Sequence, residues 1–180
     1  MVVLGAAAVG KSCFVIRWYS SNFVEDYDPT LQDSYRKNIR VDYEDYVLDV
    51  YDTAGVDDYQ LVRDKFIQIG EGFILMYSIT SEDSYREIPN IFNRIESIND
   101  GKLPILLVGN KCDLDGPLRQ VKKAEAQLTA ETHGWGFFEA SAKSDDNVYE
   151  SIQSIVRSVV AYRRLHTPAP VKPKKKCVIL

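Results

Sequence analysis

The segment Gly5–Ser12, with the sequence GAAAVGKS, fits the spacing G-x-x-x-x-G-K-[ST]. It follows a short apolar run, Val2–Leu4, and it opens a stretch with apolar residues at helical spacing. This strand–loop–helix context is the one in which the spacing binds phosphates, because the loop N–H groups point inward and the helix N-terminus adds positive potential. We expect Lys11 to reach the β- and γ-phosphates of a nucleotide and the Ser12 hydroxyl to ligate Mg²⁺. The alternative is a tight turn with a solvated lysine, which this context disfavours. The contacts expected from this segment are Gly5, Ala8, Val9, Gly10, Lys11, Ser12 and Cys13.

A carboxylate stands where a second Mg²⁺ anchor is expected. Asp52 ends the run Tyr46–Tyr51 and is followed by Thr53-Ala54-Gly55. Beside a phosphate loop, an aspartate at the C-terminal end of a buried strand holds the metal, usually through water. Gly55 has no side chain, so its backbone N–H can approach the γ-phosphate. D-x-x-G alone is a weak signal, and its pairing with the first motif makes it a strong one.

Two further strings predict the base that is bound. Asn110-Lys111-Cys112-Asp113 follows the apolar run Ile105–Val108 directly. Guanine presents its N1–H and its N2 amine side by side, so a fixed carboxylate such as that of Asp113 can accept both, whereas adenine would leave it unpaired. Ser141-Ala142-Lys143 adds a backbone N–H for the guanine O6. The expected base contacts are Asn110, Lys111, Asp113, Ser141, Ala142 and Lys143.

The elements that must position these motifs alternate along the chain. The patterns predict the order β-α-β-β-α-β-α-β-α-β-α, which indicates an α/β domain with helices on both faces of a sheet. Phe73–Ile79 and Ile105–Val108 are continuous apolar runs of the buried, parallel type. One hairpin, with its break at Glu44-Asp45, makes the sheet mixed. Helical spacing predicts a single helix across 85–95.

Composition and charge narrow the class of protein. The chain has 180 residues, of which 45% are hydrophobic and 27% charged, as in one soluble globular domain with a short appendage. No apolar stretch approaches the ~18 residues needed to span a bilayer. Three cysteines without a secretory signal predict an intracellular, reduced protein. From Arg163 onward six residues are basic and none is acidic, so the rest of the chain is more acidic than the net charge of −4. A basic tail on an acidic body argues against nucleic acid as a partner.

Taken together, these motifs resemble those of a Ras-superfamily small GTPase of the Ras/Rap-like branch. The resemblance runs from Val2 to about Arg164 and resumes over the last four residues. It implies an α/β P-loop NTPase small G domain, with a six-stranded mixed sheet flanked by five helices. It also implies a monomer that binds GTP or GDP with Mg²⁺ and acts as a signalling switch. We place the G domain at residues 1–164 and a disordered basic tail at 165–180.

The resemblance adds residues that the patterns alone do not assign. Tyr27-Asp28-Pro29-Thr30 resembles the first switch segment, and Asp52–Tyr59 resembles the start of the second. By that likeness Phe23 stacks on the guanine, Tyr27 closes over the phosphates, and Thr30 ligates Mg²⁺. The stretch Tyr27–Tyr35 resembles the edge strand with which relatives bind effector proteins. Exchange factors and activating proteins are the other partners that the family implies.

Two departures from the family concern hydrolysis. Val56 stands where Ras-like proteins carry glutamine and Rap-like ones threonine. In Ras itself this glutamine orients the attacking water, and valine has neither donor nor acceptor to do so. Ala7 and Ala8 replace two glycines, and alanine is strained wherever a positive φ is required. Lys11, Gly55 and Val56 are the positions expected to bear on catalysis, which we predict to be slow, both alone and with an activating protein.

The chain ends in Cys177-Val178-Ile179-Leu180, a C-a-a-X pattern whose final leucine favours geranylgeranylation of Cys177. One lipid rarely anchors a protein stably, and the lysines at 172 and 174–176 supply a second signal toward an anionic inner leaflet. We therefore expect the protein at the cytoplasmic face of the plasma membrane or of an endomembrane.

Two other functions share part of this pattern. A non-hydrolysing adaptor that stays bound to GTP would carry the same binding motifs, and only a hydrolysis rate separates it from a switch. A small P-loop kinase would need an arginine-bearing lid and an acceptor pocket, and Asp113 favours guanine instead.

Overall fold

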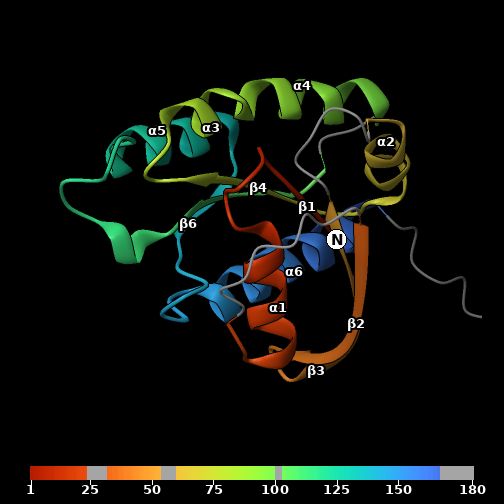
Figure 1. The fold of residues 1–180 in the computed structure, drawn as a ribbon. Coiled ribbons are helices and arrows are strands. Elements are labelled where there is room, and N and C mark those ends of the chain that lie inside the picture. The colour runs from red at the N-terminus through yellow and green to blue at the C-terminus, as the bar shows by residue number, and fades with distance from the viewer. Residues whose placement is uncertain (24–31, 54–59, 100–102, 167–180) are drawn as a thin grey trace, which may run out of the picture.

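The computed structural model describes residues 1–23, 32–53, 60–99 and 103–166 (Figure 1). Its six-stranded sheet has the order β2-β3-β1-β4-β5-β6. The β2–β3 pair is antiparallel and every other pair of neighbours is parallel, so the predicted mixed sheet is confirmed. The strands are β1 (Val2–Leu4), β2 (Gln32–Val41), β3 (Glu44–Thr53), β4 (Phe73–Ser78), β5 (Ile105–Asn110) and β6 (Gly136–Glu139).

The helices of the described residues are α1 (Lys11–Ser20), α2 (Gln60–Ile69), α3 (Glu82–Arg86), α4 (Ile88–Ile98), α5 (Lys123–His133) and α6 (Val148–His166), with a 3₁₀ turn η2 (Cys112–Leu114). The single helix predicted across 85–95 is interrupted at Glu87 and divided into α3 and α4. Pro89 explains the break, because it has no N–H to donate to the Tyr85 carbonyl one turn earlier. Counted as one interrupted helix, α3 and α4 bring the helices of the described chain to the five that the family fold implied.

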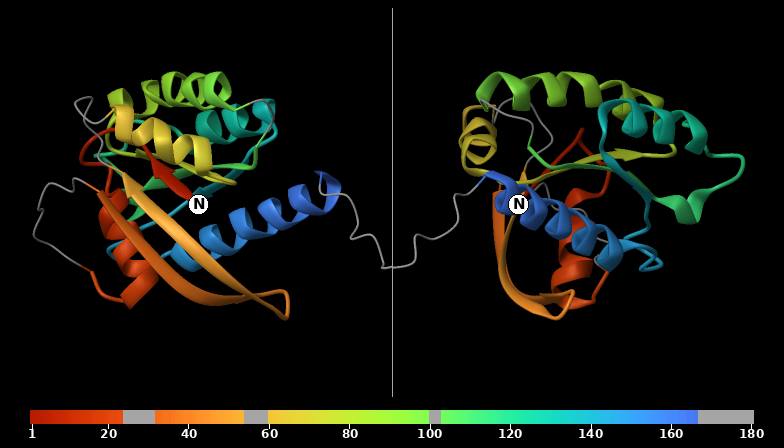
Figure 2. Two further views of the ribbon diagram at one scale, coloured as in Figure 1. Left: turned by 90° about the vertical axis from the view of Figure 1, so that its right-hand side faces the viewer. Right: turned by 180° about the vertical axis from the view of Figure 1, so that it is seen from behind.

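Helices cover both faces of the sheet (Figure 2). Because side chains alternate along a strand, Val3 of β1 packs on one face, and Val2 and Leu4 pack on the other. The Val3 face carries α1 and α6, and the opposite face carries α2, α3, α4 and α5. Strands β4 and β5 are buried over their whole length, as their continuous apolar runs predicted.

The hairpin turn lies two residues earlier than its sequence indicated. Asp42 and Tyr43 form the turn with φ values of 49° and 70°, and Glu44 already pairs with Val41. The predicted break at Glu44-Asp45 is therefore wrong. A two-residue turn with both φ values positive matches the twist of the flanking strands, and here it forms without the Asn-Gly or Asp-Gly pair that usually marks it.

None of the helices in the described part of the chain has both the length and the apolar character needed to cross a bilayer.

Candidate nucleotide-binding site

The predicted motifs meet at one edge of the sheet. The parallel strands β1, β3, β4, β5 and β6 all end at this edge, where open α/β sheets bind their ligands. Gly5 follows β1 and Asp52 lies at the end of β3. Asn110 ends β5 and Ser141 comes two residues after β6. Segments far apart in the chain are thus brought to the head of α1.

The turn before α1 depends on left-handed backbone at two positions. Gly10 has a φ of 94°, and a Cβ there would lie only 2.4 Å from Nδ2 of Asn110. Ala8 has a φ of 61°, a conformation that costs an L-residue about 1–2 kcal/mol. The positive φ that would strain an alanine in this loop is therefore present at Ala8.

Lys11 is almost completely buried, with 6% of its surface exposed. Its Nζ donates to the Gly5 carbonyl at 3.0 Å and to the Ala6 carbonyl at 2.8 Å. The pKa of Lys11 is lowered to about 8, chiefly by burial, with Asp52 opposing the shift and Arg63 adding to it. An ammonium with neutral partners in a desolvated place favours an anionic ligand, because phosphate oxygens would stabilise its charge better than carbonyls do.

The Asp52 carboxylate is buried, and within the described ranges neither of its oxygens has a hydrogen-bond partner of ordinary geometry. Burial raises the pKa of Asp52, and the Ser12 hydroxyl and the Lys11 ammonium partly offset that rise. Buried carboxylate oxygens of this kind are costly unless a cation or a donor accompanies them. The residues present therefore fit Mg²⁺, with Ser12 and Asp52 on the protein side of the site.

Asn110 links the loop for the phosphates to the loop for the base. Its Nδ2 donates to the Val9 carbonyl at 2.8 Å, and its Oδ1 accepts from the Ala142 N–H at 3.3 Å. Lys111 adds a second link, since its Nζ donates to the Ala8 carbonyl at 2.9 Å. Ala142 belongs to the string that was expected to offer a backbone N–H to guanine O6, and its N–H makes a long bond to Asn110 here. The role of that string toward the base stays a prediction.

A cavity of about 170 Å³ lies between these loops. Asp113 stands in its wall and accepts a hydrogen bond from the Ser141 hydroxyl at 2.6 Å. That hydroxyl in turn accepts the N–H of Lys143 at 3.2 Å. The lining residues are Gly10, Cys13, Phe23, Asn110, Lys111, Asp113, Leu114, Ala142 and Lys143. All except Leu114 were predicted from the sequence.

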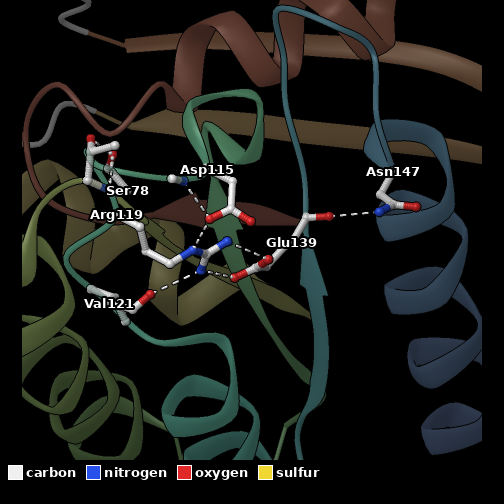
Figure 3. Close-up of polar contacts among 8 residues, drawn as sticks. Ser78, Asp115, Arg119, Val121, Glu139 and Asn147 are labelled. Atoms are coloured by element: carbon white, nitrogen blue, oxygen red, sulfur yellow. Dashed lines mark hydrogen bonds and ion pairs between the residues drawn. The ribbon is translucent and has the colours of Figure 1, made fainter.

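Arg119 bonds both Asp115 and Glu139 (Figure 3), and no motif in the sequence predicts it. Its Nε donates to Asp115 at 2.6 Å, and its Nη1 and Nη2 donate to the two carboxylate oxygens of Glu139 at 2.6 and 3.0 Å. Asp115 lies two residues after Asp113, and Glu139 lies two residues before Ser141. One guanidinium therefore connects the two segments that carry the predicted base contacts.

Several predicted positions lie outside the described residues: Tyr27, Thr30, Gly55, Val56 and Cys177. Their roles stay predictions. From Gln32 onward the predicted effector stretch belongs to β2, which is an edge strand of the sheet.

A phosphate loop coupled by Asn110 to an aspartate-lined base cavity, on this sheet order, defines a P-loop domain of the guanine-nucleotide-binding class. The sequence profile of the Ras family matches residues 1–161. Ras-like protein rasS of Dictyostelium discoideum is 43% identical over 190 residues, which cover 100% of this chain and 97% of rasS. Ras-like protein rasB of the same organism is 41% identical over 181 residues, with 100% and 90% coverage. The chain belongs to the Ras family of small GTPases, which the resemblance of its motifs had indicated.

Proposed function

We propose that this chain is a membrane-anchored GTP/GDP switch that hydrolyses GTP slowly. The observation that carries the switch is the buried pair at the head of α1. There, among the described residues, the Lys11 ammonium donates to two neutral carbonyls, and the buried carboxylate of Asp52 has no hydrogen-bond partner of ordinary geometry. Such a pair is stabilised when an anionic phosphate and a divalent cation arrive together, as they do with a Mg²⁺-bound nucleotide.

Binding would use each group for one task. Lys11 would exchange the carbonyls of Gly5 and Ala6 for β- and γ-phosphate oxygens. Ser12, Asp52 and Thr30 would hold Mg²⁺, with Asp52 acting through water. When bound, Mg²⁺ neutralises charge on the β- and γ-phosphate oxygens. Asp113 would accept the two adjacent donors of guanine, which selects against adenine.

Two features of the chain support slow hydrolysis. Val56 offers no donor or acceptor for a water molecule in line with the γ-phosphate. Ala7 and Ala8 replace glycines in the phosphate loop, and Ala8 holds a strained conformation. Their methyl groups would crowd the side of the γ-phosphate where an activating protein inserts its arginine. Nucleotide binding is retained because Lys11, Ser12 and Asp113 are present.

Single-turnover hydrolysis of preloaded GTP, with and without an activating protein, tests this proposal. We expect little turnover and little stimulation. Val56→Gln combined with Ala7→Gly should raise the rate by roughly tenfold or more, a change of about 1.4 kcal/mol in the barrier. The affinity of each variant for GDP serves as the control. A wild-type rate equal to that of glutamine-bearing relatives would refute slow hydrolysis.

An adaptor that remains bound to GTP is the second candidate, and Val56 favours it. The two candidates differ in one measurement: a switch converts its GTP within a signalling cycle, whereas an adaptor leaves it intact over hours. The edge strand β2 provides the surface for effectors in either case, since its free backbone groups can pair with a partner strand.

Membrane attachment is proposed from Cys177 and the preceding lysines. A lipid on Cys177 together with a polybasic segment gives the two signals that stable anchoring needs. Cys177→Ser should move the protein from the membrane fraction to the supernatant. Retention of this variant on membranes would contradict the proposed anchor.

A further inference from the structure

The side chain of Arg17 contacts segments around the base cavity, but Arg17 itself does not line the cavity. It lies on α1, and its Nε donates to the Ala142 carbonyl at 2.8 Å. Its Nη2 donates to the Lys143 carbonyl at 3.0 Å, and its Nη1 donates to the Ser21 carbonyl at 2.9 Å. Both carbonyls of the 142–143 loop are thus fixed to α1 across more than a hundred residues of sequence.

The same guanidinium lies 5.7 Å from the centre of the Phe23 ring. A cation at this distance is attracted to the face of an aromatic ring. Phe23 and the 142–143 loop both line the base cavity. Arg17 therefore fixes two parts of one wall at once, from outside the space that a base would occupy.

These contacts require arginine. A guanidinium is planar and carries donors in several fixed directions, so it can bond three carbonyls while it remains close to a ring. A lysine ammonium would keep the charge near Phe23 but could not span all three carbonyls. A glutamine would keep one donor group and lose the charge.

We propose that Arg17 is a positioning residue that determines how long the protein retains a guanine nucleotide. This inference rests on the proposed base site, because a base held between Phe23 and the 142–143 loop can leave only when these walls separate. Arg17 makes none of its contacts with Lys11, Ser12 or Asp52. Its loss should therefore speed nucleotide release and leave the hydrolysis of bound GTP unchanged.

The test uses the full chain loaded with GDP that carries a fluorescent group on its ribose, chased with excess GDP in the presence of Mg²⁺. Arg17→Ala and Arg17→Gln should release the nucleotide about tenfold faster, which corresponds to about 1.4 kcal/mol. Arg17→Lys should restore part of the retention through the charge on Phe23. Arg157→Ala is the matched control, since Arg157 also lies on a helix but pairs with Asp42; its release rate should stay within twofold of wild type.

Two further readouts separate positioning from general damage to the fold. The ratio of the GDP and inosine diphosphate release rates should not change in the Arg17 variants, because Arg17 does not read the N2 amine that inosine lacks. Single-turnover hydrolysis of preloaded GTP should also stay at the wild-type rate. A purely structural role would lower the melting temperature without giving faster release or rescue by Arg17→Lys.

The possible failures are distinguishable. If the wild-type chain does not retain GDP, the proposed nucleotide site itself is wrong. If the wild type retains GDP and the Arg17 variants release it no faster than Arg157→Ala, the inference about Arg17 is wrong and the site stands. Should the alanine variant fail to fold, Arg17→Gln and Arg17→Lys carry the same comparison.

Discussion

Breaking the largely buried ion pair between Arg119 and Glu139 should cost more stability than breaking an exposed pair such as Arg36–Asp49. The side chain of Arg119 is 16% exposed and that of Glu139 is 9% exposed, and both carboxylate oxygens accept a guanidinium N–H. Arg119→Ala would leave the Glu139 carboxylate largely buried and unpaired. Removal of one partner of a buried pair costs about 3–5 kcal/mol, and the residual exposure here places the loss near the lower end, at about 3 kcal/mol.

Arg36→Ala is the matched comparison. Arg36 also bonds both oxygens of a carboxylate, that of Asp49, but the two side chains are 74% and 37% exposed. Solvent screens such a pair, so its loss should lower stability far less than the loss of Arg119. The two variants differ in burial, and they also differ in bonding, because Arg119 additionally donates to Asp115 and to the Val121 carbonyl. Glu139→Gln leaves these two bonds in place and so tests the buried pair alone.

Thermal unfolding with GDP and Mg²⁺ at one fixed concentration measures the difference, since bound ligand itself raises the transition. For a domain of this size a loss of about 3 kcal/mol lowers the transition by about 6–12 °C. Arg36→Ala should lower it much less. Glu139→Gln should resemble Arg119→Ala, because it also breaks the buried pair. Equal losses for Arg119→Ala and Arg36→Ala would refute the argument from burial.

Three further results are expected. Tyr77→Phe should raise the free energy of unfolding by about 1 kcal/mol, because the buried Tyr77 hydroxyl has no hydrogen-bond partner in the part of the chain that the structure describes. A loss of stability in urea unfolding would show that the hydroxyl is satisfied. Ala8→Gly should raise the free energy of unfolding of the nucleotide-free protein by about 1 kcal/mol, because glycine adopts the left-handed backbone without strain. An unchanged free energy of unfolding would contradict the strain at Ala8. Because the pKa of Lys11 is about 8, the free protein loses this proton as the pH rises past 8, whereas bound phosphates would favour the charged form. GTP affinity should thus be constant below pH 7 and fall about tenfold between pH 7 and 9. Calorimetry in two buffers at pH 8 should detect uptake of about half a proton on binding. No uptake would exclude Lys11 as the group that is protonated when phosphates bind.

Most of the fold could be predicted from the sequence because its signals are local. Continuous apolar runs identified β4 and β5, and the alternation of patterns gave the order of strands and helices. The errors are local as well. The hairpin turn at Asp42 and Tyr43 lacks the usual turn residues. The apolar spacing across 85–95 continues past Pro89, so it indicates one helix where the backbone forms two.

The residues of the candidate site also fall into those that a local sequence pattern predicts and those that it does not. Gly10, Lys11 and Asp113 were found because phosphate and base recognition impose fixed spacings on short strings. Arg17 and Arg119 were not found, because each acts through contacts between segments distant in sequence, which no local pattern records. Leu114 was missed for a simpler reason, since it adds an apolar surface beside the Asp113 motif and carries no chemistry of its own.

The position of Asn110 between the two loops has a thermodynamic consequence. A ligand that orders the backbone around Val9 also orders the backbone around Ala142, so each half of the site should be better preorganised once the other half is filled. Guanosine and pyrophosphate supplied as separate molecules should therefore each bind weakly, and each should increase the affinity of the other. Such positive cooperativity between the fragments would mean that the buried amide of Asn110 contributes to the affinity for an intact nucleotide by coupling the two loops.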